Sequence, residues 1–129
     1  MLFQADLSGS APSEIFVAFW SGHDAEETVR VFSEHLVSGV LDRRAGLDGI
    51  VADSASNWRV ERMAVVDRNV LRLGVYEILY ESDTPAAVVI DEAIEIAKKF
   101  GSQESGAFIN GILDDVRLRH ESGQIEVPP

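Results

Sequence analysis

Three successive segments in the second half of the chain carry apolar side chains at helical spacing, and this pattern constrains the fold more than any other feature. Within each segment the apolar residues recur every three or four positions, which gathers them on one face of an α-helix. No segment alternates apolar and polar residues as a half-buried β-strand does, so the sequence predicts an all-α fold. The three stripes consist of Leu71, Val75, Ile78 and Leu79, then of Val89, Ala93, Ile96, Ala97 and Phe100, and finally of Phe108, Ile109, Ile112, Leu113 and Val116.

Residues with strong turn preferences indicate where these helices begin and end. Ser82 and Asp83 end the first helix, and Gly101 provides a C-terminal stop for the second. Thr84 has a side chain that can cap the second helix, and Pro85 suits its first position because proline lacks the amide hydrogen that goes unsatisfied there. We therefore expect three helices joined by tight turns.

The first half of the chain has a weaker helical pattern. Asp24 followed by Glu27 has the spacing of a capping box, with aspartate in place of the usual serine or threonine. It predicts the start of a helix that reaches Arg43 or Arg44. Residues 46–55 are expected to form another short helix.

A polar loop at residues 54–57 is the best candidate for a boundary within the chain. The chain has 129 residues, of which 46% are hydrophobic. That is enough to build one core or the cores of two tightly packed subdomains, and both arrangements stay open at this point.

The chain is strongly acidic, with 22 acidic against 11 basic side chains and a formal net charge of -11. Nucleic-acid binding draws much of its affinity from the neutralisation of phosphates by lysine and arginine. A chain with this balance would bind RNA only through a local basic patch or beside a basic partner. Charge alone favours the simpler interpretation that the carboxylates keep the protein soluble.

Several classes of protein are disfavoured by what the sequence lacks. There is no cysteine, so disulfides and thiolate metal sites are excluded. No run approaches the roughly 18 apolar residues of a membrane span, and Met1 is not followed by a secretory signal pattern, which favours a cytoplasmic protein. The three histidines are scattered, so we expect no metal site and no cofactor, and His35 is expected to be a partly buried packing residue. The sequence contains neither a glycine-rich phosphate-binding loop nor a nucleophile elbow, so neither motif indicates an enzyme.

A few residues of the last predicted helix resist a purely structural explanation. Gly106 and Gly111 fall inside it, where each glycine costs up to about 1 kcal/mol relative to alanine, so close approach by another helix or by a ligand is expected. Asn110 lies off the buried stripe and could read a base edge or bond a neighbouring loop. Phe108 borders the polar face, where it could be core or offer a stacking surface.

Two arginines lie one turn apart on the first of the three predicted helices, beside its apolar stripe. Arg72 is expected to form a structural pair with a carboxylate. Arg68 is the more plausible surface contact. Taken singly, each of these residues favours a structural role, so the residues alone indicate a helical interaction module.

As strings of residues, parts of the second half resemble the signature of the NusB transcription antitermination factors. The resemblance spans nearly the whole chain, with a looser match in the first half through residues 2–4. The most specific strings follow one another in the family's order at residues 69–73, 76–77, 93–101 and 108–114.

This resemblance implies an all-α fold of two small helical bundles packed together, here an N-terminal subdomain over residues 1–57 and a C-terminal subdomain over residues 58–129. It also implies a protein that is not an enzyme. Members of the family pair with NusE, a small-subunit ribosomal protein, and bind the boxA element of ribosomal RNA transcripts. They thereby bring the elongating RNA polymerase into a termination-resistant antitermination complex and support ribosomal RNA synthesis.

The resemblance also implies roles for particular residues. Asp67 falls at an acidic position that faces the ribosomal protein, with Arg68 beside it and Phe3 at the surface shared by partner and RNA. Lys98 and Lys99 would supply phosphate contacts. The residues predicted to bind RNA are Phe3, Lys98, Lys99, Glu104, Phe108 and Asn110.

One departure from the family pattern concerns the start of the chain. Members of the family begin with an arginine-rich stretch that contributes strongly to RNA affinity, whereas this sequence opens directly at residues 1–4 of the first helix. Either the start lies at an internal methionine or the basic arm is absent. With a net charge of -11, we expect weak RNA binding by this chain alone.

Two other functions are consistent with the sequence. The chain could be a protein-only interaction module that keeps the surface for the ribosomal protein but has lost RNA recognition. It could also be the RNA-recognition domain of a ribosomal RNA methyltransferase, some of which carry a similar helical domain. Self-association into a homodimer is a further expectation, because apolar surface meant for a partner can pair with a copy of itself.

Overall fold

The described part of the chain is helical throughout, as the sequence predicts. The computed structural model describes residues 2, 26–55, 58–81 and 83–127, and within these ranges there is no β-strand. The helices are α3 (Glu27–Asp42), α4 (Arg44–Ser54), the short 3₁₀ helix η1 (Val60–Arg62), α5 (Val65–Tyr80), α6 (Ala86–Phe100) and α7 (Ser105–Glu121).

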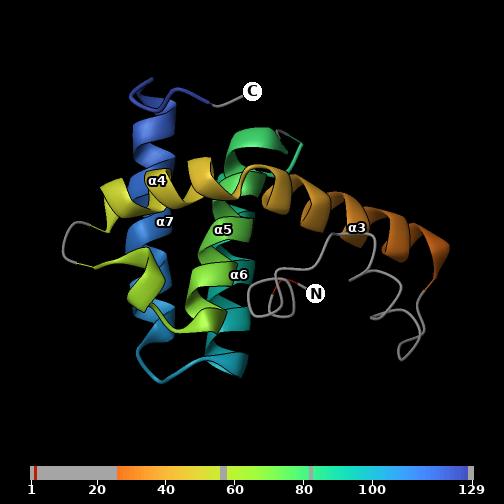
Figure 1. Ribbon diagram of the computed structural model, residues 1–129, viewed down its shortest axis with the longest axis horizontal. Coiled ribbons are helices and arrows are strands. Elements are labelled where there is room, and N and C mark those ends of the chain that lie inside the picture. Colours follow the sequence, from red (N-terminus) through yellow and green to blue (C-terminus); the bar gives the residue numbers. More distant parts are fainter. Residues whose placement is uncertain (1, 3–25, 56–57, 82, 128–129) are drawn as a thin grey trace.

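The arrangement of the helices brings the two halves of the sequence into contact. α5, α6 and α7 run alongside one another and all three pack together, while α3 and α4 follow one another across them (Figure 1). α4 contacts both α5 and α7, and α3 contacts α5. The long axis of the molecule therefore follows α3 and α4, with the end of α4 placed over α7 (Figure 1).

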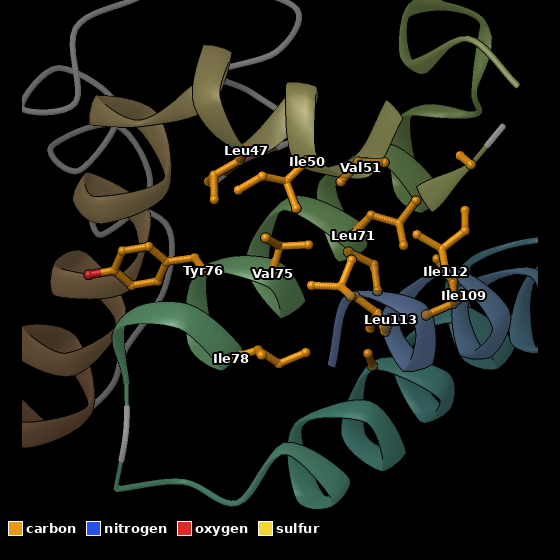
Figure 2. Packing of buried hydrophobic residues seen from close by; sticks show 14 of the residues in the cluster. Leu47, Ile50, Val51, Leu71, Val75, Tyr76, Ile78, Ile109, Ile112 and Leu113 are labelled. Atoms are coloured by element: carbon orange, nitrogen blue, oxygen red, sulfur yellow. The ribbon is translucent and has the colours of Figure 1, made fainter. Parts of the chain in front are cut away.

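A single cluster of buried apolar side chains lies where α4, α5 and α7 meet (Figure 2). Leu47, Leu71 and Leu113, one from each of these helices, are completely buried. Burying a leucine side chain of this kind contributes about 1.5–3 kcal/mol relative to leaving it exposed. Of the apolar stripes predicted from the sequence, the buried members include Leu71, Val75, Ile78, Val89, Ala93, Ala97, Ile109, Ile112, Leu113 and Val116.

Some members of the predicted stripes stay at the surface. Ile96 and Phe100 near the end of α6 are exposed, and Phe32 of α3 is exposed as well. Phe108 is partly buried and packs against the core cluster, so it lies between the two roles expected for it.

The predicted helix starts are wrong in detail. α6 begins at Ala86 with Pro85 as its N-cap residue, and Thr84 makes no capping hydrogen bond. α3 begins after Glu26, so the residue at its cap is not the expected Asp24, which lies outside the described residues. None of the five α-helices described has a side-chain N-cap hydrogen bond, so their stability comes from tertiary packing.

Arg72 forms the ion pair with a carboxylate that the sequence predicts. Its partner is Asp48 of α4, whose two carboxylate oxygens accept hydrogen bonds from the Arg72 Nε (2.7 Å) and Nη2 (2.8 Å). The Nη1 of Arg72 donates to the Asn69 side-chain oxygen at 3.1 Å. This bidentate geometry is the strong form of an arginine–carboxylate contact, and it holds α4 against α5.

A second arginine ties α4 to the last helix. The Nη1 of Arg119 in α7 donates to the Ser54 hydroxyl at 2.6 Å, and its Nη2 lies 3.7 Å from an Asp53 carboxylate oxygen. Together with the Arg72 contact, this fixes the end of α4 over α7, which is where the candidate site lies.

His35 is not the partly buried packing residue that the sequence suggests. Its side chain is 58% exposed, and its Nε2 lies 2.7 Å from the Glu81 carboxylate, which accepts the hydrogen bond. The pair links α3 to the end of α5. The expectation fails because the described fold buries α3 only near its end, at Val37, Gly39 and Val40, and leaves the preceding part of the helix largely uncovered.

Candidate nucleic-acid interface

The predicted site residues fall in two places on the surface. Lys98 and Lys99 lie at the end of α6, and Glu104, Phe108 and Asn110 lie at the start of α7. Asp67 and Arg68 lie in the first turn of α5. Phe3 lies outside the described residues.

The turn between α6 and α7 joins the two helices that carry the first group. Gly101 caps α6, and its amide donates to the Ala97 carbonyl at 2.8 Å. A Cβ at this glycine would lie 2.6 Å from the Ser105 hydroxyl oxygen and 2.7 Å from the Ala97 carbonyl oxygen, so only glycine fits so tight a turn. The Ser102 amide then donates to the buried Ser105 hydroxyl (2.9 Å), which directs the chain into α7.

The cationic groups at the end of α6 are exposed. The Lys98 ammonium lies 4.0 Å from the Glu95 carboxylate, and the Lys99 ammonium lies 5.4 Å from the centre of the Phe100 ring. Both lysines therefore stay available to a ligand, since surface ion pairs of this kind contribute about 0–1 kcal/mol. Glu104, the N-cap residue of α7, is exposed beside them and makes no side-chain cap.

An aromatic pair lies on the other side of the start of α7. The rings of Phe108 and Trp58 are 5.4 Å apart between centroids and meet edge to face at 73°. Trp58 follows α4 in the chain, and its amide donates to the Ala55 carbonyl at 2.7 Å. The Trp58 side chain is 62% exposed, which is unusual for so large an apolar group.

Sequence reasoning missed Trp58 because it belongs to no helix and therefore to no periodic stripe. The available signal was its composition: a tryptophan just after a polar loop and directly before Arg59. An isolated aromatic in a polar, basic segment is more typical of a contact surface than of a core.

Two shallow hollows meet at Trp58. The first, of about 290 Å³, is lined by Trp58, Phe108, Gly111 and neighbouring small residues of α4 and α7. The second, of about 480 Å³, is lined by Trp58 together with Arg59, Arg68 and Arg72, and also by the acidic side chains Asp48 and Glu61. Trp58 thus borders two hollows, one without a charged side chain in its lining and one lined by three guanidinium groups and two carboxylates.

The two glycines of α7 differ in their surroundings. A Cβ at Gly106 would meet the Lys98 side chain at 3.4 Å, so this glycine faces the adjacent helix α6 as expected. A Cβ at Gly111 would meet no described heavy atom within 4 Å. Packing within the described chain therefore gives no reason for Gly111, which forms part of the floor of the first hollow.

The first turn of α5 presents a second kind of feature. One carboxylate oxygen of Asp67, Oδ1, is buried and has no hydrogen-bond partner among the described residues. Beside it, the Arg68 Nη1 donates a long hydrogen bond (3.5 Å) to the Glu61 carbonyl. A buried acceptor without a donor costs free energy, so this oxygen does not stabilise the described fold, while the rest of the Asp67 side chain is partly exposed.

The described residues contain no group of three or more His, Cys, Asp or Glu side chains arranged to hold a metal ion. None of the helices in the described ranges is long and apolar enough to cross a membrane.

Comparison with known proteins decides the family. The model of the NusB family matches residues 1–117. The chain belongs to the NusB family. It is 41% identical over 126 residues to the transcription antitermination protein NusB of Sorangium cellulosum (strain So ce56), covering 98% of this chain and 89% of that protein. It is 42% identical over 121 residues to that of Bacillus velezensis, covering 94% and 90%.

Solved NusB structures share the fold. The chain superimposes on T. maritima NusB with a TM-score of 0.83 and 33% identity, covering 96% of this chain and 89% of that one. A crystal structure of the antitermination factors NusB and NusE in complex with dsRNA gives a TM-score of 0.81 at 24% identity, covering 91% and 87%. The all-α NusB fold predicted from the sequence is confirmed.

Proposed function

We propose that this NusB-family chain is a transcription antitermination factor that binds RNA together with NusE. The observation that carries the proposal is the 41% identity, over 98% of the chain, to a protein named for transcription antitermination. A related NusB has been crystallised with NusE and double-stranded RNA, which supports the choice of partners. Its RNA would be the boxA element of ribosomal RNA transcripts, and its place of action the cytoplasm.

The proposed RNA surface is the end of α6 with the start of α7. Two exposed lysines there can contact phosphates, and an aromatic side chain and an amide can contact bases. The residues assigned to it are Phe3, Lys98, Lys99, Glu104, Phe108 and Asn110.

The proposed surface for NusE is the start of α5. The partly exposed carboxylate of Asp67 supports this assignment, because a basic ribosomal protein can donate hydrogen bonds to the accessible part of that group. Arg68 lies one residue further on and Phe3 is assigned to the same surface. The function requires only binding, so the proposal includes no catalytic group.

Net charge sets the order of assembly in this proposal. With a net charge of -11, the chain repels RNA at long range. Its 11 basic side chains are too few to neutralise its 22 acidic ones. A basic partner bound at Asp67 would reduce the repulsion next to the lysines. We therefore propose that NusE binds first and that RNA binds to the joint surface.

The test is a salt-series titration of boxA RNA with and without NusE. RNA binding that requires NusE and weakens as salt rises would support the proposal. An Asp67→Ala variant should then lose NusE affinity, whereas Asp53→Ala, at an exposed carboxylate of α4, should retain it.

Two outcomes would contradict parts of the proposal. If NusE binds but RNA does not, the chain is a protein-only interaction module, which the net charge of -11 also favours. If NusE does not bind either, the proposed partner is wrong.

A further inference from the structure

The exposure of Trp58 is the observation from which this inference starts. A tryptophan buries a large apolar area when it is inside a fold, yet this one is 62% exposed and is held by an edge-to-face contact with Phe108. The described chain gives it no further aromatic partner and leaves a hollow of about 290 Å³ beside it. The hollow is shallow and most of the side chains that line it are apolar, with Ser54 among them, so it suits a flat ring that carries polar edges.

The charge beside Trp58 indicates what kind of ring. The second hollow at Trp58 is lined by three arginines (Arg59, Arg68 and Arg72) against two acidic residues (Asp48 and Glu61), in a chain whose acidic groups outnumber its basic groups by 22 to 11. Arg72 is held by Asp48, and Arg68 donates to the Glu61 carbonyl. Arg59 is exposed next to the tryptophan. A planar apolar site with a cation one residue away fits a nucleobase and its phosphate.

We propose that Trp58, supported by Phe108, stacks on one unpaired base of single-stranded RNA, while Arg59 contacts the adjacent phosphate. This inference rests on the proposed function and extends its RNA surface from α7 across to the segment after α4. The base would lie over Gly111, where the missing side chain leaves the floor of the hollow open. Bases inside a duplex are already stacked on their neighbours, so the site selects single strands.

The experiment measures binding of a short boxA RNA to the full chain in complex with NusE, as a single strand and as a duplex. Trp58→Leu should weaken single-strand binding about 10-fold, within the range that stacking aromatics give, at an unchanged salt slope. Arg59→Gln should instead lower the salt slope by about one. Trp58→Phe should retain most of the affinity, because it keeps a stacking ring.

Fluorescence provides a direct readout. The chain has two tryptophans. Single-stranded RNA should quench the fluorescence of the native chain. If Trp58→Phe abolishes this quenching, the quenched residue is Trp58. Gly111→Leu, which places a side chain in the hollow and leaves Trp58 itself unchanged, should reduce both the quenching and the affinity. Thermal unfolding of each variant shows that it is folded.

The control for exposed aromatic surface is Phe32→Leu. Phe32 is 55% exposed on α3, and α3 extends to the opposite end of the molecule from the chain that follows α4 (Figure 1). This substitution should leave RNA affinity unchanged.

Three results would overturn the inference while leaving the proposed function intact. The first is RNA affinity of Trp58→Leu within about twofold of the native complex. The second is equal dependence on Trp58 for the duplex and the single strand. The third is a loss of NusE affinity in Trp58→Leu, measured without RNA, that is as large as its loss of RNA affinity. This result would make Trp58 a protein contact. If the native complex binds no RNA, the proposed function fails and this inference fails with it.

Discussion

At the scale of single residues, the buried Arg72 guanidinium is paired with a carboxylate of another helix. It is 6% exposed and donates both of its short hydrogen bonds to Asp48. Asp48→Ala would leave this charge buried without its carboxylate, and we expect a loss of about 3 kcal/mol in the free energy of unfolding. Urea denaturation measures it.

A double-mutant cycle separates the ion pair from other effects of the substitution. In an Arg72→Met background, which has no charge to leave unpaired, Asp48→Ala should cost much less. Equal losses in the two backgrounds would show that the pair contributes little and that Asp48 acts in some other way.

The same residues show what the sequence could and could not predict about the site. Helical spacing placed Arg72 beside an apolar stripe and so predicted a carboxylate partner. The partner, Asp48, lies 24 residues away on another helix, and no local pattern identifies it. Trp58 was missed for the related reason that its contact with Phe108 exists only once α4 and α7 are packed together.

At the scale of helices, the crossing of α3 and α5 depends on a glycine. A Cβ at Gly39 would overlap the ring of Tyr76, which is buried on α5 and stacked on Tyr80. We expect Gly39→Ala to destabilise the chain by about 1–3 kcal/mol, because the ring must move in a packed interior. Chemical denaturation checks this.

Gly49→Ala is the matched control. Gly49 lies exposed in α4, with no described atom within 4 Å of an added Cβ. There the better helix propensity of alanine should stabilise the chain by up to about 1 kcal/mol. Opposite signs at the two glycines are the expected result, and the same sign at both would refute the close crossing.

Between α5 and α6 a carboxylate responds to pH. Burial raises the pKa of Glu77, and the charges of Glu92 on α6 and of Glu81 raise it further. Its contribution to stability is therefore fully present below the ordinary glutamate pKa of about 4.3 and is lost as pH rises through the folded value. Glu77→Gln should be more stable than the native chain at pH 7.

Unfolding curves from pH 3.5 to about pH 8 provide the measurement. The two proteins should converge below about pH 4, where Glu77 is protonated in both states. Glu126→Gln, an exposed carboxylate near the C-terminus, should show no such difference. A native chain that is the more stable at pH 7 would contradict the assigned cause.

The bodies of the helices were predictable from sequence, and their starts were not. The stripes of α5, α6 and α7 follow from the spacing of apolar residues, and most of these residues are buried in the packed core. Pro85 fell one position earlier than expected because its helix begins without a side-chain cap. When packing rather than a side-chain cap sets the start of a helix, the local residues do not determine at which position it begins.

At the scale of the whole molecule, the net charge of -11 should make stability and RNA affinity respond to salt in opposite directions. Repulsion among carboxylates opposes the compact state, so screening by NaCl should raise Tm. The same screening should weaken RNA binding by the complex with NusE. A Tm that falls between about 0.05 and 0.5 M NaCl would show that attractive ion pairs outweigh the repulsion.

α7 has one face in the core and another in the candidate site. Ile109 and Leu113 are completely buried, while Phe108 and Gly111 line the hollow beside Trp58. Because α7 packs on α4, α5 and α6, it has no freedom to adjust separately from the rest of the described fold. RNA held there should slow hydrogen exchange at the most protected core amides, and not only at those next to the ligand.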